Sequence, residues 1–174
     1  TINGKRVYTY NFQLQNHMKS SGVGVLCHEM FHSLGAPDLY HYSSATSYLQ
    51  PAYKWDLMEW DLNPPQHMTA YMKWKYGKWI AAIPEITSAG TYSLNPLTSA
   101  ANNCYRIASP LSATEYFVVE YRKKGTSTFE NSLPGEGLLV MRINTTRTGN
   151  ANGPPDELYI YRPNGTTTAN GSPS

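Results

Sequence analysis

Hydrophobic residues follow a helical spacing in the first half of the chain. Apolar side chains between Val23 and Leu34 recur often enough to bury one face of a helix. The segment from Gln66 to Tyr76 repeats this spacing and follows a Pro-Pro pair, which suits the entry to a helix. Ahead of both, residues 6–10 have the composition of a strand. We therefore expect a strand and two helices in this half.

The second half changes to a strand pattern. From residue 86 onward, apolar stretches are separated by Gly, Pro and Asn turn signals about every 8–14 residues, which is typical of antiparallel strands. Expected strands include Asn103–Ala108 and Leu158–Arg162, and the tail from Asn164 to Ser174 has the composition of a disordered loop. The sequence thus predicts an α+β protein with two regions, 1–83 and 84–174.

Candidate chemistry lies in the first helix, where His28 and His32 are one helical turn apart. Side chains at positions i and i+4 project from the same face, so both imidazoles can bind one Zn²⁺ ion at about 2.0–2.1 Å. Glu29 follows the first histidine and can reach a metal-bound water as a general base. Ser20 and Ser21 are the candidates for the N-cap of this helix.

The residues after His32 predict a sharp turn that brings a third ligand to the metal. Gly35 tolerates the left-handed conformation that ends many helices, and Pro37 cannot continue the helix. Asp38 then follows with a carboxylate, an ordinary zinc ligand at about 2.0–2.2 Å. A histidine pair alone can arise by chance, but the added Gly, Pro and Asp favour a true zinc site.

A second segment, Tyr53–Trp60, supports the metal site. Among zinc peptidases whose motif extends past the second histidine, a methionine turn lies beneath the metal. Met58 is the candidate, since a thioether packs there without competing for the ion; it can also be an ordinary core residue between two tryptophans. Glu59 is the alternative carboxylate ligand if Asp38 does not bind the metal.

These motifs resemble the immune inhibitor A type of secreted bacterial metallopeptidases. The specific part is the H-E-x-x-H-x-x-G-x-x-D core within Gly24–Tyr40, and the segment Trp55–Met58 adds to it. The segment 64–80 is similar to a following helix of that family. Tyr116–Arg122 and Leu133–Val140 are similar to a later strand pair, so the resemblance covers most of the chain.

The resemblance implies a zincin-like fold and a secreted endopeptidase that uses one zinc ion. His28, His32 and Asp38 would be its ligands, and proteins or peptides its substrates; we expect a monomer. The chain departs from the family after the methionine, where Glu59 and Trp60 replace small residues, and at 141–143, where a histidine and an acid are absent.

Length adds one expectation. Zincin-like folds place a mostly β subdomain ahead of the active-site helix, and few residues precede that helix here. We therefore expect the chain to be a fragment of a longer precursor that contains a partial catalytic domain (1–83) and a β-rich domain (84–174).

Peptide hydrolysis also needs a group that stabilises the developing oxyanion. Tyrosine and histidine side chains near the motif could serve, and the sequence does not choose among them. The candidates are Tyr40, His41, Tyr48, Tyr53 and His67. Of these, the two histidines are expected to lie on the surface.

Composition and charge exclude some partners. Charged residues make up 15% of the chain and the net charge is +2, so no basic face indicates nucleic-acid binding. The basic run Arg122–Lys124 is expected to be a solvated strand end. No apolar segment approaches about 18 residues, which disfavours a membrane span. Cys27 and Cys104 are expected to be free thiols.

Two other functions stay open from the sequence. One is a catalytically inactive, zincin-like module at the cell surface whose β region binds a glycan or a protein. The other is a zinc hydrolase that acts on a non-peptide substrate. Glu29 favours an enzyme, because a purely structural zinc site has no use for a general base.

Overall fold

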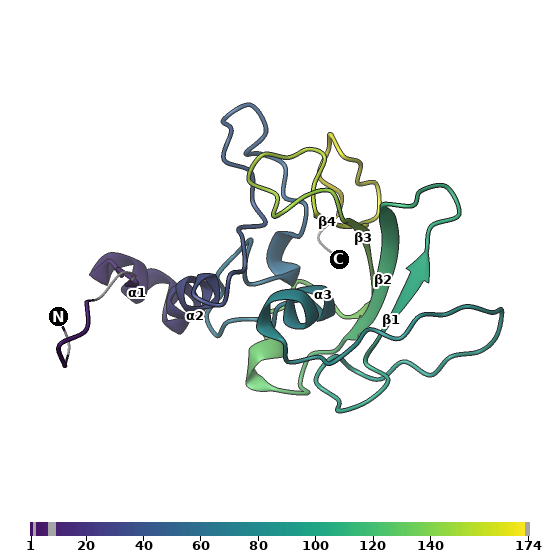
Figure 1. Cartoon of the computed structure of the whole chain (residues 1–174), viewed down its shortest axis with the longest axis horizontal. Coiled ribbons are helices and arrows are strands. Elements are labelled where there is room, and N and C mark those ends of the chain that lie inside the picture. Colours follow the sequence, from purple (N-terminus) through teal and green to yellow (C-terminus); the bar gives the residue numbers. More distant parts are fainter. Residues whose placement is uncertain (2, 7–9, 173–174) are drawn as a thin grey trace.

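A four-stranded antiparallel sheet lies on one side of the molecule, and the helices lie on the other (Figure 1). The computed structural model describes residues 1, 3–6 and 10–172. The strands neighbour one another in chain order: β1 Cys104–Ala108, β2 Glu115–Arg122, β3 Gly137–Asn144 and β4 Leu158–Ile160. The fold is therefore α+β, as predicted.

Strand β2 follows the two-residue period expected of a half-buried strand. Its buried side chains are Tyr116, Val118, Glu120 and Arg122. The prediction that Arg122 lies at a solvated strand end is therefore wrong, since the alternation turns its side chain toward the core. Lys123 and Lys124, which follow the strand, are exposed as expected.

The other predicted strands agree with the structure to different degrees. β1 and β4 begin within the predicted segments. β3 begins at Gly137 rather than at Leu133, because a turn containing Pro134 comes first and proline cannot donate a hydrogen bond to a sheet. Among the described residues, the segment 86–103 forms no strand, and Pro96 pairs with Tyr121 of β2 in a single bridge.

Two consecutive helices precede the predicted metal ligands. Helix α1 (Gln15–Ser21) was not expected; it has no buried residue and so lacks the apolar face that sequence analysis detects. Helix α2 (Val23–His32) carries the motif and begins after Gly22, with no side-chain cap. The prediction that Ser20 or Ser21 caps α2 is wrong, because both serines belong to α1.

The second predicted helix starts later than expected. α3 covers only Ala70–Met72, and a π-helical turn, Lys73–Gly77, continues it. Thr69 caps the start by accepting a hydrogen bond from the Met72 amide. Gln66 instead donates a side-chain hydrogen bond to the carbonyl of Trp60 in the preceding loop, which holds residues 66–68 outside the helix.

One hydrophobic core joins α2 and α3 to the sheet. It includes Phe31 of α2, Met72 of α3 and Val118 of β2, together with Trp55 in the short 3-10 helix Tyr53–Trp55. A second 3-10 helix, Thr128–Glu130, follows β2. Because this core contains side chains from both predicted regions, the two regions pack together, and their boundary near residue 84 stays a prediction.

The described part of the predicted tail forms no helix or strand but is attached to the body. The Asn170 side chain accepts a hydrogen bond from the Gln50 amide at 2.9 Å and donates one to the Tyr48 carbonyl at 2.6 Å. The tail up to residue 172 is therefore a loop with fixed contacts, not the disordered segment that its composition predicts.

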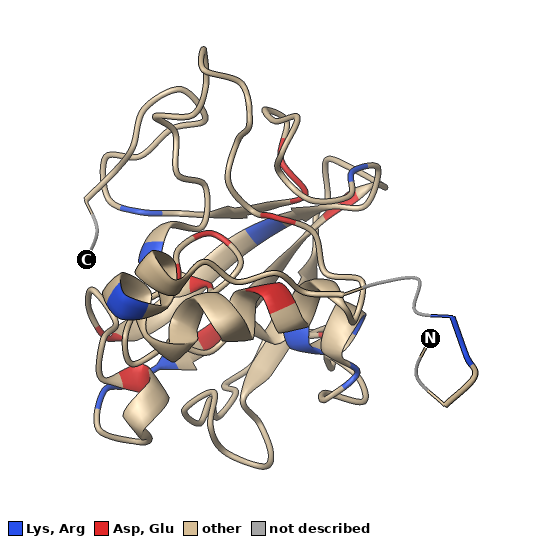
Figure 2. Cartoon of the chain, turned by 90° about the vertical axis from the view of Figure 1, so that its left-hand side faces the viewer, with Lys and Arg blue, Asp and Glu red and all other residues tan. Residues whose placement is uncertain are grey.

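Three further expectations concern the ends and the surface of the molecule. The predicted strand at 6–10 falls largely on residues 7–9, which lie outside the described residues. Cys27 and Cys104 are both free, as predicted. Within the described residues, the helices lack the length and apolar character needed to cross a membrane. Basic and acidic residues are interspersed on the side shown in Figure 2.

Candidate metal centre

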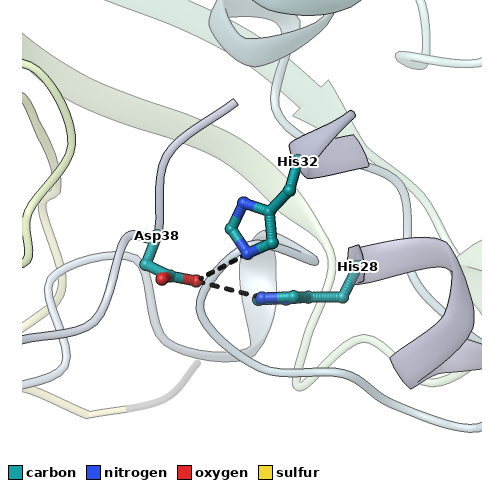
Figure 3. A group of neighbouring side chains, drawn as sticks. All are labelled: His28, His32 and Asp38. Carbon is teal, nitrogen blue, oxygen red and sulfur yellow. Dashed lines mark hydrogen bonds and ion pairs between the residues drawn. The ribbon is translucent and has the colours of Figure 1, made fainter. Parts of the chain in front are cut away.

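His28, His32 and Asp38 converge in the structure as the motif predicts (Figure 3). The two histidines lie one turn apart on α2, and the chain reverses direction directly after the helix ends. Gly35 makes this reversal possible, since it adopts φ +93° and its amide donates to the His32 carbonyl at 2.8 Å. The turn returns the Asp38 carboxylate to the histidine face of α2.

The ligand atoms of the three side chains all lie within 4.8 Å of one another. Asp38 Oδ1 lies 3.0 Å from His28 Nε2 and 3.3 Å from His32 Nε2. Ligand atoms about 2.0–2.2 Å from a tetrahedral zinc ion lie about 3.3–3.6 Å apart, so the two separations from Asp38 are close to those of a zinc site. The imidazole rings are nearly perpendicular, at 84°, with centroids 4.9 Å apart. Among the described residues, His28, His32 and Asp38 form the one group of three or more His, Cys, Asp or Glu side chains that lie close enough to share a metal ion.

Hydrogen bonds to the Nδ1 atoms of both histidines leave their Nε2 atoms for a metal. His28 Nδ1 donates to the Leu57 carbonyl at 2.9 Å, and His32 Nδ1 donates to the Ala36 carbonyl at 2.7 Å. A carbonyl oxygen can only accept, so each Nδ1 carries a proton and each Nε2 faces the site. This is the outer-shell arrangement that orients histidine ligands in metalloproteins, and the residues present therefore fit a zinc ion.

The electrostatics of the three groups are strongly coupled. The hydrogen bond to Asp38 raises the pKa of His32 to about 9, although burial opposes the shift. Burial would raise the pKa of Asp38, but hydrogen bonds from His28, His32 and Tyr42 outweigh it and lower that pKa below its usual range. Asp38 is therefore an ionised carboxylate, as a metal ligand must be.

Glu29 lies beside this group and is half-buried. Its negative charge contributes, after the larger effects of the Asp38 hydrogen bond and of burial, to the raised pKa of His32. The carboxylate is thus close enough to the ligand face to interact with it and exposed enough to meet a substrate. Both properties are needed for the predicted role of general base.

Two tyrosines complete the surroundings of the site. The Tyr42 hydroxyl donates to Asp38 Oδ2, the carboxylate oxygen that does not face the histidines. The Tyr40 ring is stacked on His28, with centroids 6.4 Å apart. Burial, together with the charges of Asp38 and Glu29, raises the pKa of Tyr40 to about 12, so its hydroxyl stays protonated at neutral pH. The sequence predicted Tyr40 as a candidate and missed Tyr42, for which it carries no local signal.

The alternative ligand Glu59 is bound elsewhere. One of its carboxylate oxygens accepts hydrogen bonds from the amides of Ala52 and Tyr53, the latter at 2.8 Å. The group of possible metal ligands consists of His28, His32 and Asp38 and does not include Glu59. The structure therefore favours Asp38 over Glu59 as the third ligand.

The other oxyanion candidates have different surroundings. His41 is buried, not on the surface as expected: its Nε2 lies 2.6 Å from Asp156 Oδ1, and its Nδ1 donates to the Thr46 carbonyl at 3.0 Å. His67 is half-buried, with its ring against Phe129. Neither histidine belongs to the ligand group.

The two tyrosines in the candidate set also lie away from the ligands. Tyr48 is exposed, and its carbonyl binds the tail. The Tyr53 ring packs beside Trp60, with centroids 6.2 Å apart. Tyr40 is thus the predicted candidate that the structure brings beside the candidate metal ligands.

Met58 is fully buried in the segment expected to support the metal. Its carbonyl accepts a hydrogen bond from the Leu39 amide at 2.9 Å, and the preceding residue, Leu57, holds His28. The turn around Met58 therefore contacts the chain beside two of the three ligands. A methionine turn beneath the metal stays a prediction.

Comparisons with protein-family models, with curated proteins and with solved structures found no match for this chain. The resemblance to immune inhibitor A metallopeptidases therefore rests on the motifs alone.

Proposed function

We propose that this protein is a zinc-dependent endopeptidase with a zincin-like fold. One observation carries the proposal: His28, His32 and Asp38 bring three ligand atoms within 4.8 Å of one another, while both Nδ1 atoms are hydrogen-bonded to backbone carbonyls. Structural zinc sites have four protein ligands, whereas catalytic sites have three and an open position. Three ligands with a neighbouring glutamate support catalysis.

The protein's own residues supply the remaining parts of a hydrolytic mechanism. A zinc ion bound here would supply a coordinated water with a pKa of about 7 and a Lewis acid for a carbonyl. The Glu29 carboxylate would accept the proton of the attacking water and pass it to the leaving amine. The Tyr40 hydroxyl, kept protonated by its raised pKa, would donate a hydrogen bond to the oxygen of the attacked carbonyl.

The choice of a peptide substrate rests on the resemblance of Gly24–Tyr40 and Trp55–Met58 to secreted metallopeptidases. The same resemblance supports a secreted location. A zinc hydrolase with another substrate would use the same ligands and the same general base, so substrate assays must separate the two.

Metal analysis and proteolysis test the proposal together. We expect purified protein to hold one zinc ion per chain by mass spectrometry and to cleave casein, with cleavage lost on chelation and restored by zinc. Glu29→Gln should keep the zinc and lose the cleavage, because only the base is removed. Zinc-loaded protein that cleaves esters but no peptide would favour the non-peptide hydrolase. Protein that binds no zinc would overturn the proposal.

A further inference from the structure

The turn Trp55–Met58 contacts both sides of the candidate metal centre. The Leu57 carbonyl accepts the hydrogen bond of His28 Nδ1 at 2.9 Å. The Met58 carbonyl accepts from the amide of Leu39, the residue after Asp38, at 2.9 Å. A shift of this turn would therefore change the position of His28 relative to Asp38.

Two charged side chains hold this turn in place. Arg122 Nη1 donates to the Trp55 carbonyl at 2.8 Å. Asp56 accepts from the Met58 amide at 2.8 Å on one carboxylate oxygen and from the Thr69 amide at 2.7 Å on the other. The turn is thus fixed to β2 through Arg122 and to the start of α3 through Asp56.

Arg122 is itself rigidly held. Its Nε and Nη2 each donate to the Glu130 carboxylate at 2.8 Å, which forms a two-point ion pair. Its Nη1 also donates to Glu120 at 3.1 Å, and Glu120 in turn accepts from the Ala70 amide at 2.6 Å. Arg122 and Glu120 are both 0% exposed. Buried ion pairs of this kind have little freedom to rearrange, so the Trp55 carbonyl has a fixed partner.

We propose that Arg122 is a positioning residue for the metal centre, acting through the Trp55 carbonyl and the Leu57–His28 hydrogen bond. The inference rests on the proposed function, because it assigns Arg122 a role in zinc binding. The planar guanidinium donates to Trp55, Glu120 and Glu130 at once. A lysine ammonium has three donors on a flexible stem and cannot reproduce this planar arrangement.

A purely structural role makes a different prediction. If Arg122 only stabilises the core, its replacement lowers the melting temperature but leaves the metal centre of the folded protein unchanged. Val118 provides the matched control, since it is fully buried on the same core-facing side of β2. Val118→Ala should lower the melting temperature through lost packing, but the valine side chain makes no hydrogen bond to the turn, so the hydrogen bonds of Trp55 and Leu57 stay in place.

The experiment compares the full wild-type chain with Arg122→Lys and Val118→Ala. Zinc affinity is measured by competition with a chromogenic chelator, and the visible spectrum of the Co²⁺-substituted protein reports ligand geometry. We expect Arg122→Lys to bind zinc about tenfold more weakly, the lower end of the range for outer-shell changes, and to show an altered Co²⁺ spectrum. Val118→Ala should keep the wild-type affinity and spectrum.

Each outcome bears on a separate claim. Wild-type affinity and spectrum in folded Arg122→Lys would overturn the positioning role. If Arg122→Lys does not fold, Glu130→Gln is tested in its place, because it weakens the ion pair that holds the guanidinium but keeps the shape of the side chain. Weaker zinc binding in Glu130→Gln supports the positioning role, and unchanged zinc binding overturns it. Wild-type protein that binds neither zinc nor cobalt would instead overturn the proposed function.

Discussion

Tyr42 donates a hydrogen bond to the oxygen of Asp38 that points away from the two histidines. The other oxygen, Oδ1, faces both imidazoles. The tyrosine therefore fixes the rotation of the carboxylate so that a single oxygen is offered to a metal. Such outer-shell contacts orient ligands and set metal affinity.

Replacing Tyr42 should weaken metal binding. Tyr42→Phe removes the hydroxyl and frees the carboxylate to rotate, so we expect zinc affinity to fall by about tenfold or more in chelator competition. Tyr48→Phe is the matched control, because the two tyrosines are similarly exposed, at 63% and 60%, and Tyr48 lies outside the ligand group. Equal affinities in the two variants would contradict the role of Tyr42.

The identity of the third ligand can be tested with two carboxylate replacements. Asp38→Asn should reduce zinc affinity by more than about 100-fold, beyond the usual range for outer-shell changes. Glu59→Gln should leave zinc affinity unchanged, since Glu59 binds the Ala52 and Tyr53 amides instead. Isothermal titration with zinc measures both. Loss of binding in Glu59→Gln with retention in Asp38→Asn would reverse the assignment.

Much of the fold follows from local patterns that the sequence displays. The helical spacing around His28 predicts α2. The resemblance of Tyr116–Arg122 to a strand of the family agrees with β2. The ligand group could be predicted as well, because its three members lie within one helix and the turn that follows. Gly35 and Pro37 predict that turn from the sequence, and in the structure Gly35 adopts φ +93°.

The rest depends on contacts between distant segments, which no local pattern reveals. Arg122 looks like the start of a basic run, yet it binds the Trp55 carbonyl across 67 positions of sequence. Gln66 fits a helical pattern but binds the preceding loop instead, so α3 starts only after Thr69. The sequence predicts that His41 lies on the surface, but the fold buries it against Asp156, which is 115 positions away in the chain.

The half-buried His67 predicts how stability depends on pH. Burial, with the nearby positive charge of Lys73, lowers its pKa from 6.5 to about 4 in the folded protein. Between these values the unfolded chain binds the proton and the folded chain does not. The free energy of unfolding should therefore fall as pH decreases from about 6.5 to about 4, by less than about 1.4 kcal/mol per pH unit because the ring is partly exposed.

Urea unfolding of chelator-treated protein across this pH range measures the effect. His67→Gln should remove this part of the pH dependence, so its stability should fall less steeply than that of the wild type. His17→Gln, at an exposed position on α1, is the control for a histidine-to-glutamine change. If the free energy of unfolding depends on pH equally in the wild type and in His67→Gln, burial does not lower the pKa of His67.

Gly24 offers a test of how α2 is placed. A Cβ added at this position would lie 2.2 Å from the Leu62 carbonyl oxygen, so Gly24→Ala must push the helix away from that loop. We expect a loss of about 1–3 kcal/mol in the free energy of unfolding and weaker zinc binding, because α2 carries two of the ligands.

The control is Gly90→Ala, whose Cβ would meet the Tyr92 ring at 3.5 Å, an ordinary contact, and should change stability by less than about 0.5 kcal/mol. Alanine forms helices better than glycine by about 1 kcal/mol, so intrinsic propensity alone predicts that Gly24→Ala stabilises the protein. A stabilised variant with wild-type zinc affinity would therefore contradict the close approach of α2 to Leu62.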